Sequence, residues 1–159
     1  QPLPFANMKD TYAMLNGRGY PDTLNPAPLT PPAENGGKIS QPESSLVTAT
    51  SGQKILLRIS NLNVTNFYTL QSMGLKMRVI GTGARQLRGP DMDGAGPQQG
   101  IDTVYETNSV TLGGGESVDV IIDTASVAPG TYFLYTTNLN FLSNNTEDFG
   151  GMMTEIRIN

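Results

Sequence analysis

The chain has 159 residues and a formal net charge of -4, with no run of lysine or arginine. A nucleic-acid interface is therefore excluded, because it needs a basic stripe that neutralises phosphates. Hydrophobic residues make up 37% of the chain and charged residues only 15%, while glycine (18) and proline (11) are plentiful. This length suits one domain with a substantial core, and the many turn-forming residues favour an all-β fold.

The chain contains no histidine and no cysteine. This excludes disulfides, thiol chemistry and Ser/His/Asp or Cys/His nucleophilic sites, and it removes the residue that most often titrates near neutral pH. No apolar run is long enough for a membrane span. Because the sequence begins at Gln1 and shows no signal peptide, we expect a processed product or a piece of a longer polypeptide.

The first 45 residues carry mainly turn and loop signals. Residues 1–10 are predicted to be a linker or extended lead-in, and residues 11–159 a single domain. Residues 11–15 form a short β-prone run that ends at Asn16-Gly17, a strong hairpin-turn signal. Residues 24–45 are rich in proline, which lacks a backbone donor, so we expect a long surface loop with extended stretches. Irregular coil is favoured there over a binding segment.

Alternating apolar residues predict strands in the rest of the chain. Ile55, Leu57 and Ile59 share one face of residues 54–59, and Val118, Val120 and Ile122 share one face of residues 116–123. Further strands are expected near residues 67–72, 76–80, 104–105, 110–112, 131–136 and 152–158. Residues 46–47 lead to a turn at Ser51-Gly52, and a second loop is expected at 81–101. No segment keeps a helical period. Seven or eight strands separated by turns predict a Greek-key sandwich or barrel.

Five segments follow one another in an order known from a single protein family. Residues 12–21 are similar to the motif Ile-Asn-Gly-x-x-Tyr-Pro, and residues 52–62 to an apolar strand that follows glycine and contains arginine and asparagine. Residues 71–81 follow the frame of His-Leu-His-Gly-His and an apolar strand. Residues 110–120 are similar to a strand pair joined by Gly-Glu, and residues 130–137 with 151–153 follow the frame of Gly-x-Trp-x-x-His-Cys-His and a later Gly-Met-Met, with Tyr-Thr-Thr in place of His-Cys-His. Together these segments resemble the laccase-like multicopper oxidases, most closely the copper-free middle domain of three-domain members.

The resemblance implies a cupredoxin-like fold whose copper ligands have been replaced. The family's ligand positions fall on Gln71, Met73, Leu75, Tyr135, Thr136 and Thr137. Blue-copper and trinuclear sites need imidazole and thiolate ligands, which these side chains lack. We therefore expect no catalytic, cofactor-binding or metal-ligating residue in this chain, and copper only in other domains of the parent protein.

Two functional hypotheses follow from the resemblance. In the first, the chain is a non-catalytic spacer between copper-bearing cupredoxin domains of the same polypeptide, whose parent oxidises a substrate and reduces O₂. The low charge content fits a domain that covers part of its surface with neighbours. In the second, it is a stand-alone, copper-free module that binds another protein through a sheet edge. The family implies an extracytoplasmic location (periplasmic, cell-surface or secreted), and a homo-oligomer is left open.

Two further patterns suggest metal sites and receive simpler interpretations. A lone thioether is a weak copper ligand, so Met73, Met152 and Met153 are expected to serve core or interface packing. Residues 91–94 resemble the start of a calcium loop, but the fifth position is Ala95, which has no oxygen ligand to offer. We expect an acidic turn there.

Three remaining patterns also have structural interpretations. Residues 113–115 are three glycines without a following Gly-Lys-Ser/Thr, so they predict a hairpin turn rather than a phosphate loop. Asn63 and Asn144 begin glycosylation-type sequons and are expected to be polar loop residues. Three neighbouring carboxylates are expected to lie on a solvated strand face: Glu116, Asp119 and Asp123.

Overall fold

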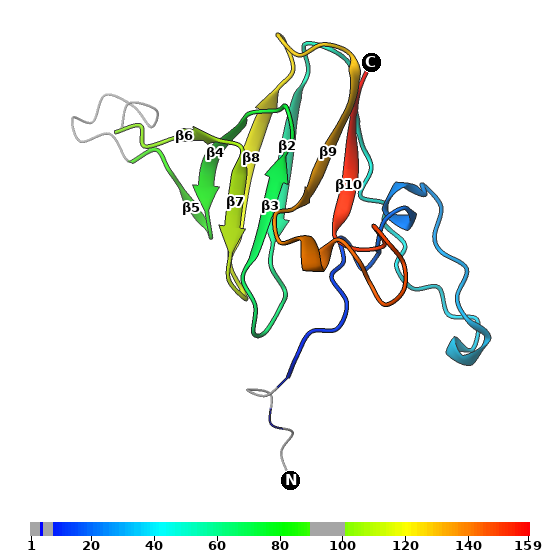
Figure 1. Cartoon of the computed structure of the whole chain (residues 1–159). Coiled ribbons are helices and arrows are strands. Elements are labelled where there is room, and N and C mark those ends of the chain that lie inside the picture. The colour runs from blue at the N-terminus through cyan, green and yellow to red at the C-terminus, as the bar shows by residue number, and fades with distance from the viewer. Residues whose placement is uncertain (1–3, 5–7, 90–100) are drawn as a thin grey trace.

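The computed structural model describes residues 4, 8–89 and 101–159, which form two β-sheets packed face to face (Figure 1). The prediction of an all-β fold is confirmed. Within the described residues the only helices are three short 3-10 turns, η2 (Asp22–Leu24), η3 (Ala33–Asn35) and η4 (Leu139–Phe141).

The first sheet, which we call the β9 sheet, has five strands. Their order is β1 (Val47–Ala49), β10 (Met153–Ile158), β9 (Gly130–Thr136), β3 (Tyr68–Ser72) and β7 (Ser109–Leu112). β1 runs parallel to β10, and the other pairs are antiparallel. Strands from distant parts of the sequence are therefore neighbours, as in a Greek key.

The second sheet, which we call the β8 sheet, is antiparallel throughout. Its order is β2 (Lys54–Ser60), β8 (Ser117–Asp123), β4 (Met77–Thr82) and β5 (Arg85–Gln86), and β6 (Tyr105–Thr107) also pairs with β4. β2 and β8 pair over their full length, from Lys54 opposite Asp123 to Ser60 opposite Ser117.

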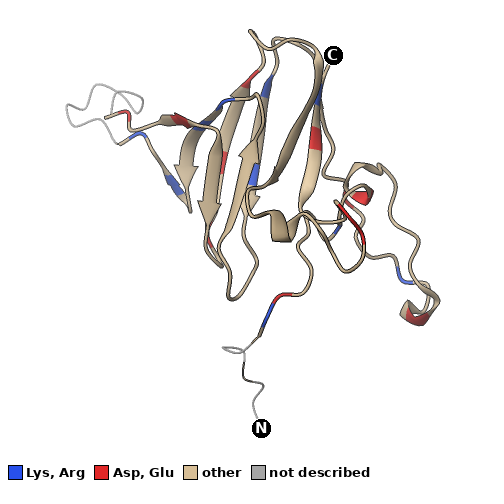
Figure 2. Ribbon diagram, viewed as in Figure 1, with Lys and Arg blue, Asp and Glu red and all other residues tan. Residues whose placement is uncertain are grey.

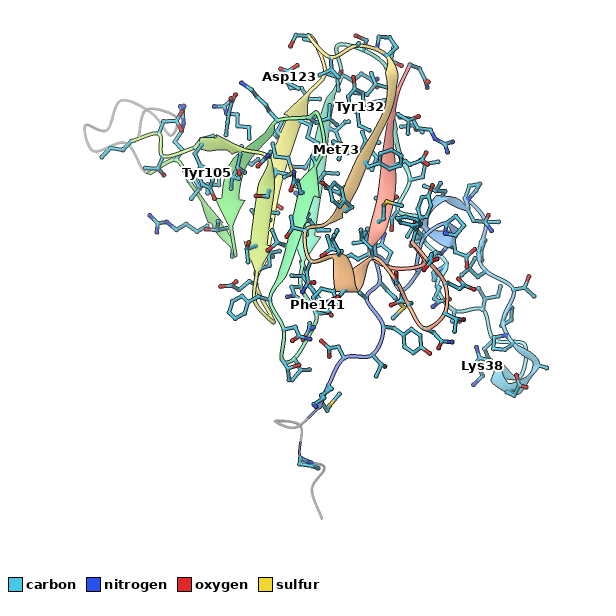
Figure 3. The ribbon with its side chains drawn as sticks, in the orientation of Figure 1. Lys38, Met73, Tyr105, Asp123, Tyr132 and Phe141 are labelled. Carbon is cyan, nitrogen blue, oxygen red and sulfur yellow. The ribbon has the colours of Figure 1, made fainter. Side chains whose placement is uncertain are left out.

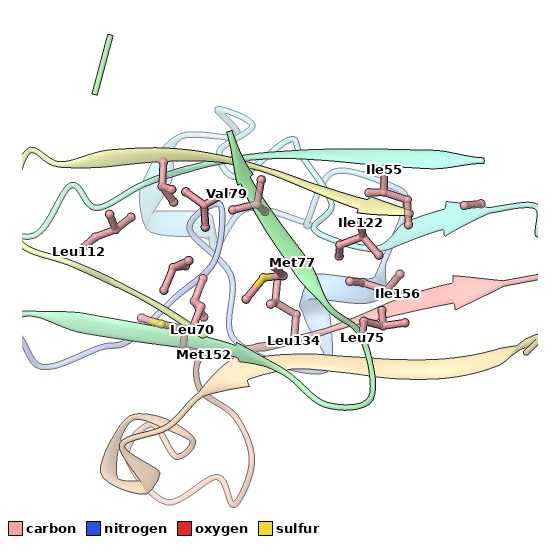
Figure 4. Close-up of a cluster of buried hydrophobic side chains, with 14 of the residues drawn as sticks. Ile55, Leu70, Leu75, Met77, Val79, Leu112, Ile122, Leu134, Met152 and Ile156 are labelled. Atoms are coloured by element: carbon pink, nitrogen blue, oxygen red, sulfur yellow. The ribbon is translucent and has the colours of Figure 1, made fainter. Parts of the chain in front are cut away.

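The core lies between the inner faces of the two sheets (Figure 4). Val118, Val120 and Ile122 are at most 3% exposed, which confirms the predicted face of residues 116–123. Ile55 is buried and Leu57 and Ile59 are partly buried, as the alternation of residues 54–59 predicted. Leu70, Leu134 and Ile156 cover the other side from the β9 sheet.

One strand lies where a loop was predicted. Residues 81–101 were expected to be a loop, but β4 continues to Thr82 and turns back into β5, with Gly81 opposite Gln86 and Thr82 opposite Arg85. The described part of the chain has ten strands, whereas seven or eight were predicted. A two-residue, fully polar strand leaves no alternating pattern that sequence reasoning could detect.

The turn predicted at Asn16-Gly17 is confirmed, but the strand before it is not. Leu15 and Arg18 exchange backbone hydrogen bonds of 2.9 and 3.0 Å around the turn, and Asn16 and Gly17 have φ values of 50° and 78°, as a type I′ turn requires. Residues 11–15 form no strand because the Asn144 side chain, rather than a neighbouring strand, binds the N–H and C=O of Ala13.

Residues 113–115 form a turn, but the hairpin prediction is wrong. The turn carries the chain from β7 in the β9 sheet to β8 in the β8 sheet. At Gly114 the backbone passes so close to the loop after β2 that a Cβ atom would lie 2.3 Å from the carbonyl oxygen of Asn63. The glycine is therefore needed for this crossing between sheets.

Candidate functional site

The positions that correspond to the family's copper ligands lie on β3 and β9 and in the residues that directly follow these two strands. The strand register places Gln71 opposite Tyr135, and the N–H of Met73 donates to the carbonyl oxygen of Phe133 at 3.0 Å. Alternation turns Gln71, Met73 and Tyr135 to the outer face of the β9 sheet. Thr136 points inward and is fully buried. The two motifs, which are about sixty residues apart, therefore meet in space.

The side chains at these positions do not fit copper. They offer a carboxamide, a thioether, an aliphatic group, a phenol and two aliphatic hydroxyls, whereas copper sites of this family need imidazole and thiolate. Leu75 is buried in the core, and the hydroxyl of Thr136 donates to the carbonyl oxygen of Asn138. Within the part of the chain that the structure describes, no three carboxylate side chains gather into a metal-holding group.

The outer surface of β7, β3 and β9 carries no charged residue, and we call it the neutral face. Met73 is 56% exposed and Phe133 36% exposed, and the hydroxyls of Thr69 and Thr111 are 2.8 Å apart across β3 and β7. Its outward-facing residues are Thr69, Gln71, Met73, Ser109, Thr111, Thr131, Phe133, Tyr135 and, on β10, Met153. Polar but uncharged side chains therefore surround an exposed thioether and an exposed aromatic ring.

At its β10 side the neutral face ends in a charged pair. Arg157 donates to Glu155 at 2.8 Å, and Glu155 is only 8% exposed. The hydroxyl of Tyr20 donates to the other oxygen of Glu155 at 3.2 Å. Burial, and then the bond to this carboxylate, raises the pKa of Tyr20 above its ordinary value.

The strands of the β8 sheet carry both basic and acidic residues (Figure 2), and ion pairs cross the outer surface of this sheet. We call this surface the charged face. Tyr105 and Asp123 lie on this sheet, whereas Met73 follows β3 (Figure 3). The pairs are Lys54–Asp123 (3.8 Å), Arg58–Asp119 (4.0 Å), Lys76–Glu106 (3.2 Å), Arg78–Asp102 (4.0 Å) and Arg88–Asp102 (2.8 Å). The predicted solvated strand face is therefore confirmed for Asp119 and Asp123. It is wrong for Glu116, which precedes β8 and accepts a hydrogen bond from the N–H of Gly113.

A buried arginine organises the proline-rich segment, and sequence reasoning missed it. Arg18 is 1% exposed and donates five hydrogen bonds to backbone carbonyls. The acceptors are Asp22, Asn25, Ala27 and Gln41. Residues 22–41 therefore wrap around this guanidinium, whose role is structural. Nothing in the local sequence distinguishes Arg18, because all its partners are backbone atoms.

A cavity of about 300 Å³ lies beside Arg18 and is walled by residues of the first turn and of the loop after η4. Tyr12, Asp22, Gln41 and Glu147 are among its lining residues. Every N–H of the Arg18 side chain is already donated to a carbonyl, so this guanidinium has no donor left to orient an anion in the cavity.

Other predicted residues have structural surroundings. The side-chain amide of Asn63 donates to Asp10, and that of Asn144 donates to the carbonyl oxygens of Ala13 and Gly150, so both are polar loop residues. Met152 packs in the core at 3% exposure. Residues 91–94 lie outside the described residues. Among the described residues, no helix has the length and apolar character that a membrane crossing requires.

Comparison with known proteins identifies the family. A model of the multicopper oxidase family matches residues 5–156. The sandwich is similar to the multicopper oxidase mgLAC, with a TM-score of 0.56 and 18% identity over 71% of this chain and 30% of that one. It is also similar to the blue copper oxidase from Nitrosomonas europaea, with a TM-score of 0.54 and 19% identity over 76% and 34% of the two chains.

A third similar structure is the laccase from Botrytis aclada, with a TM-score of 0.52 and 18% identity over 70% of this chain and 18% of that one. The chain thus spans about a third or less of the length of these proteins. No curated protein matches the chain. The family match over nearly the whole sequence, on a cupredoxin-like sandwich, shows that this chain belongs to the multicopper oxidase family.

Proposed function

We propose that the chain is a non-catalytic cupredoxin-like domain that acts as a spacer between copper-bearing domains of a multicopper oxidase. The observation that carries this proposal is the pairing of β3 with β9, which sets two of the family's ligand positions, Gln71 and Tyr135, opposite each other with neither an imidazole nor a thiolate. Oxidation of the substrate and reduction of O₂ are then the work of the flanking domains. An extracytoplasmic location is part of the same proposal.

The neutral face is the surface that we assign to a flanking domain. Interfaces are depleted of charged residues at their centres and enriched in aromatic residues and methionine. β7, β3 and β9 carry no charge on this face, and Met73 and Phe133 are exposed there. The charged face, with its exposed ion pairs, suits contact with solvent.

The first experiment is copper loading of the purified chain, followed by dialysis and metal analysis. We expect no stoichiometric copper and no oxidation of phenols or ferrous ion, because the side chains at the ligand positions do not fit copper. One tightly held copper ion per chain would contradict the proposal. Sequencing of the neighbouring coding region tests whether copper-bearing domains flank this chain. The proposal requires histidine-rich cupredoxin sequence on both sides.

The docking surface is tested in the full-length polypeptide by Phe133→Lys, with Tyr105→Lys on the other sheet as the matched control. Phe133 and Tyr105 are both exposed aromatics, at 36% and 51%. We expect the first variant to increase protease cleavage between domains and to lower copper retention, and the second to change neither. Equal behaviour of the two variants would place the interdomain contact elsewhere.

The alternative, a stand-alone binding module, is favoured by one observation. β2 is a seven-residue edge strand whose only strand neighbour among the described residues is β8. A complete reading frame that encodes no other cupredoxin domain would support this alternative over the spacer.

A further inference from the structure

The open edge of β2 has a defined set of unpaired backbone groups. At the two ends of the β2–β8 pairing, the N–H of Thr124 donates to Gln53 and the N–H of Asn61 donates to Glu116. Antiparallel bonding alternates, so the odd-numbered residues of β2 bond to β8. The N–H and C=O groups of Lys54, Leu56, Arg58 and Ser60 therefore point to the open edge, where no described residue binds them.

We propose that two copies of the chain dimerise by antiparallel pairing of β2 with β2. The twofold axis lies at Leu57, which faces Leu57 of the second copy. Lys54 then lies opposite Ser60 of the second copy, and Leu56 opposite Arg58. Every residue with free backbone groups thus lies opposite another such residue of the second copy. Each of these pairs can form the two N–H to C=O hydrogen bonds of an antiparallel ladder.

Charge selects this register over its neighbours. A shift of the register by one residue would place the free backbone groups of one β2 opposite residues whose backbone groups already bond to β8. Only shifts by two residues keep free groups opposite free groups. One such shift places Lys54 opposite Arg58, and the other places Arg58 opposite Arg58 of the second copy. Like charges directly opposite each other destabilise a strand pair. The register centred on Leu57 has no such pair and uses the whole length of β2.

The side chains of β2 also suit a strand that is paired on both sides better than a strand with one open edge. Lys and Arg on an edge strand usually discourage pairing, but Lys54 and Arg58 are each close to a carboxylate of β8, Asp123 at 3.8 Å and Asp119 at 4.0 Å. β2 contains no proline, glycine or bulge. Leu56 is 49% exposed, and a second strand beside it would cover part of that surface.

Two substitutions at one exposed position test the register. In the dimer, Leu56→Lys places a lysine opposite Arg58 twice, by symmetry, whereas Leu56→Glu places a carboxylate there. We expect the dimer dissociation constant, measured by sedimentation equilibrium, to rise about threefold to tenfold for Leu56→Lys and to fall by a similar factor for Leu56→Glu. Far-UV circular dichroism checks that both variants keep the fold.

Met73→Lys on the neutral face is the control and should leave the dissociation constant unchanged. A dimer that Met73→Lys weakens and that neither Leu56 variant affects would overturn the proposal and place the contact on the neutral face. The proposal would also be overturned if the unchanged chain and both Leu56 variants were all monomeric up to about 1 mM. The β2 edge would then bind a different partner. Neither result bears on copper loading, so this proposal and the spacer proposal fail separately.

Discussion

The two outer faces of the sandwich differ in charge although their strands alternate with the same period. On the charged face, Lys54 and Arg58 lie directly opposite Asp123 and Asp119. On the neutral face, Gln71 lies opposite Tyr135, and Met73 contacts the backbone of Phe133. Alternation decides which side chains point outward, but the chemistry of those side chains decides whether the face meets water or another surface.

The difference cannot be explained by stability alone. Exposed ion pairs contribute little to folding, about 0–1 kcal/mol each, because water screens them. The charged face therefore does not stabilise the sandwich more than the neutral face does. The charges keep that surface hydrated, whereas the neutral face has no charged residue around Gln71, Met73 and Tyr135, three of the family's ligand positions. The predictions below test this contrast, starting with the largest effect.

The largest effect is expected from Leu134→Lys, compared with Phe133→Lys at the next position of β9. Leu134 is 5% exposed and Phe133 36% exposed. A lysine buried without a partner should lower the free energy of unfolding by more than about 4 kcal/mol, whereas the outward lysine should change it by about 0.5 kcal/mol or less. Urea unfolding of both variants measures the two values. Similar losses would show that the neutral face is not on the surface.

A second effect is expected from histidines at the ligand positions. Gln71 and Tyr135 are opposite each other across β3 and β9, and directly opposed Cβ atoms lie about 5 Å apart. The double variant Gln71→His with Tyr135→His should therefore bind Cu²⁺ or Zn²⁺. At a metal concentration about a hundredfold above the dissociation constant, binding should stabilise the fold by about 2.7 kcal/mol. Thermal unfolding with and without metal is the measurement.

Each single histidine variant is the control, since one imidazole alone holds these ions weakly. Equal stabilisation of the single and double variants would mean that the two positions are not neighbours. The unchanged chain should show no shift with either ion.

Patterns within one strand were predictable from sequence, and contacts between distant segments were not. The alternation of Val118, Val120 and Ile122 defines a buried face locally, and the family frame located Gln71 and Tyr135. The direct pairing of these two residues depends on the sheet register, which the frame does not contain. The partners of Arg18 are backbone carbonyls, and any residue could supply them. The crossing at residues 113–115 depends on which sheet receives β8, and no local signal reports that.

A third, smaller effect is the loss of folding stability at high pH caused by two tyrosines, one of which contacts Glu155 at the edge of the neutral face. Burial and the bond to Glu155 raise the pKa of Tyr20 above its ordinary value of 10.0. Burial, with Asp10 nearby, also raises the pKa of Tyr68. A raised folded pKa means that the unfolded chain loses these protons first, so the stability they contribute is complete below pH 10 and is lost as pH rises further.

Thermal unfolding between about pH 8 and pH 11 measures this loss. The Tyr20→Phe variant should show a shallower decline above pH 10 than the unchanged chain, because one of the two groups no longer titrates. Parallel declines would mean that Tyr20 does not contribute to the pH dependence through its contact with Glu155.

The smallest effect is expected on the charged face, at the pair Lys76–Glu106. The two side chains are 82% and 60% exposed and 3.2 Å apart. A double-mutant cycle with Lys76→Ala and Glu106→Ala should give a coupling free energy of about 0.2–1 kcal/mol, which decreases as salt is added. A much larger, salt-independent coupling would mean that this pair is shielded from water. The charged face would then be a buried surface, and charge would no longer distinguish the face that we propose to dock from the face that we propose to remain in solvent.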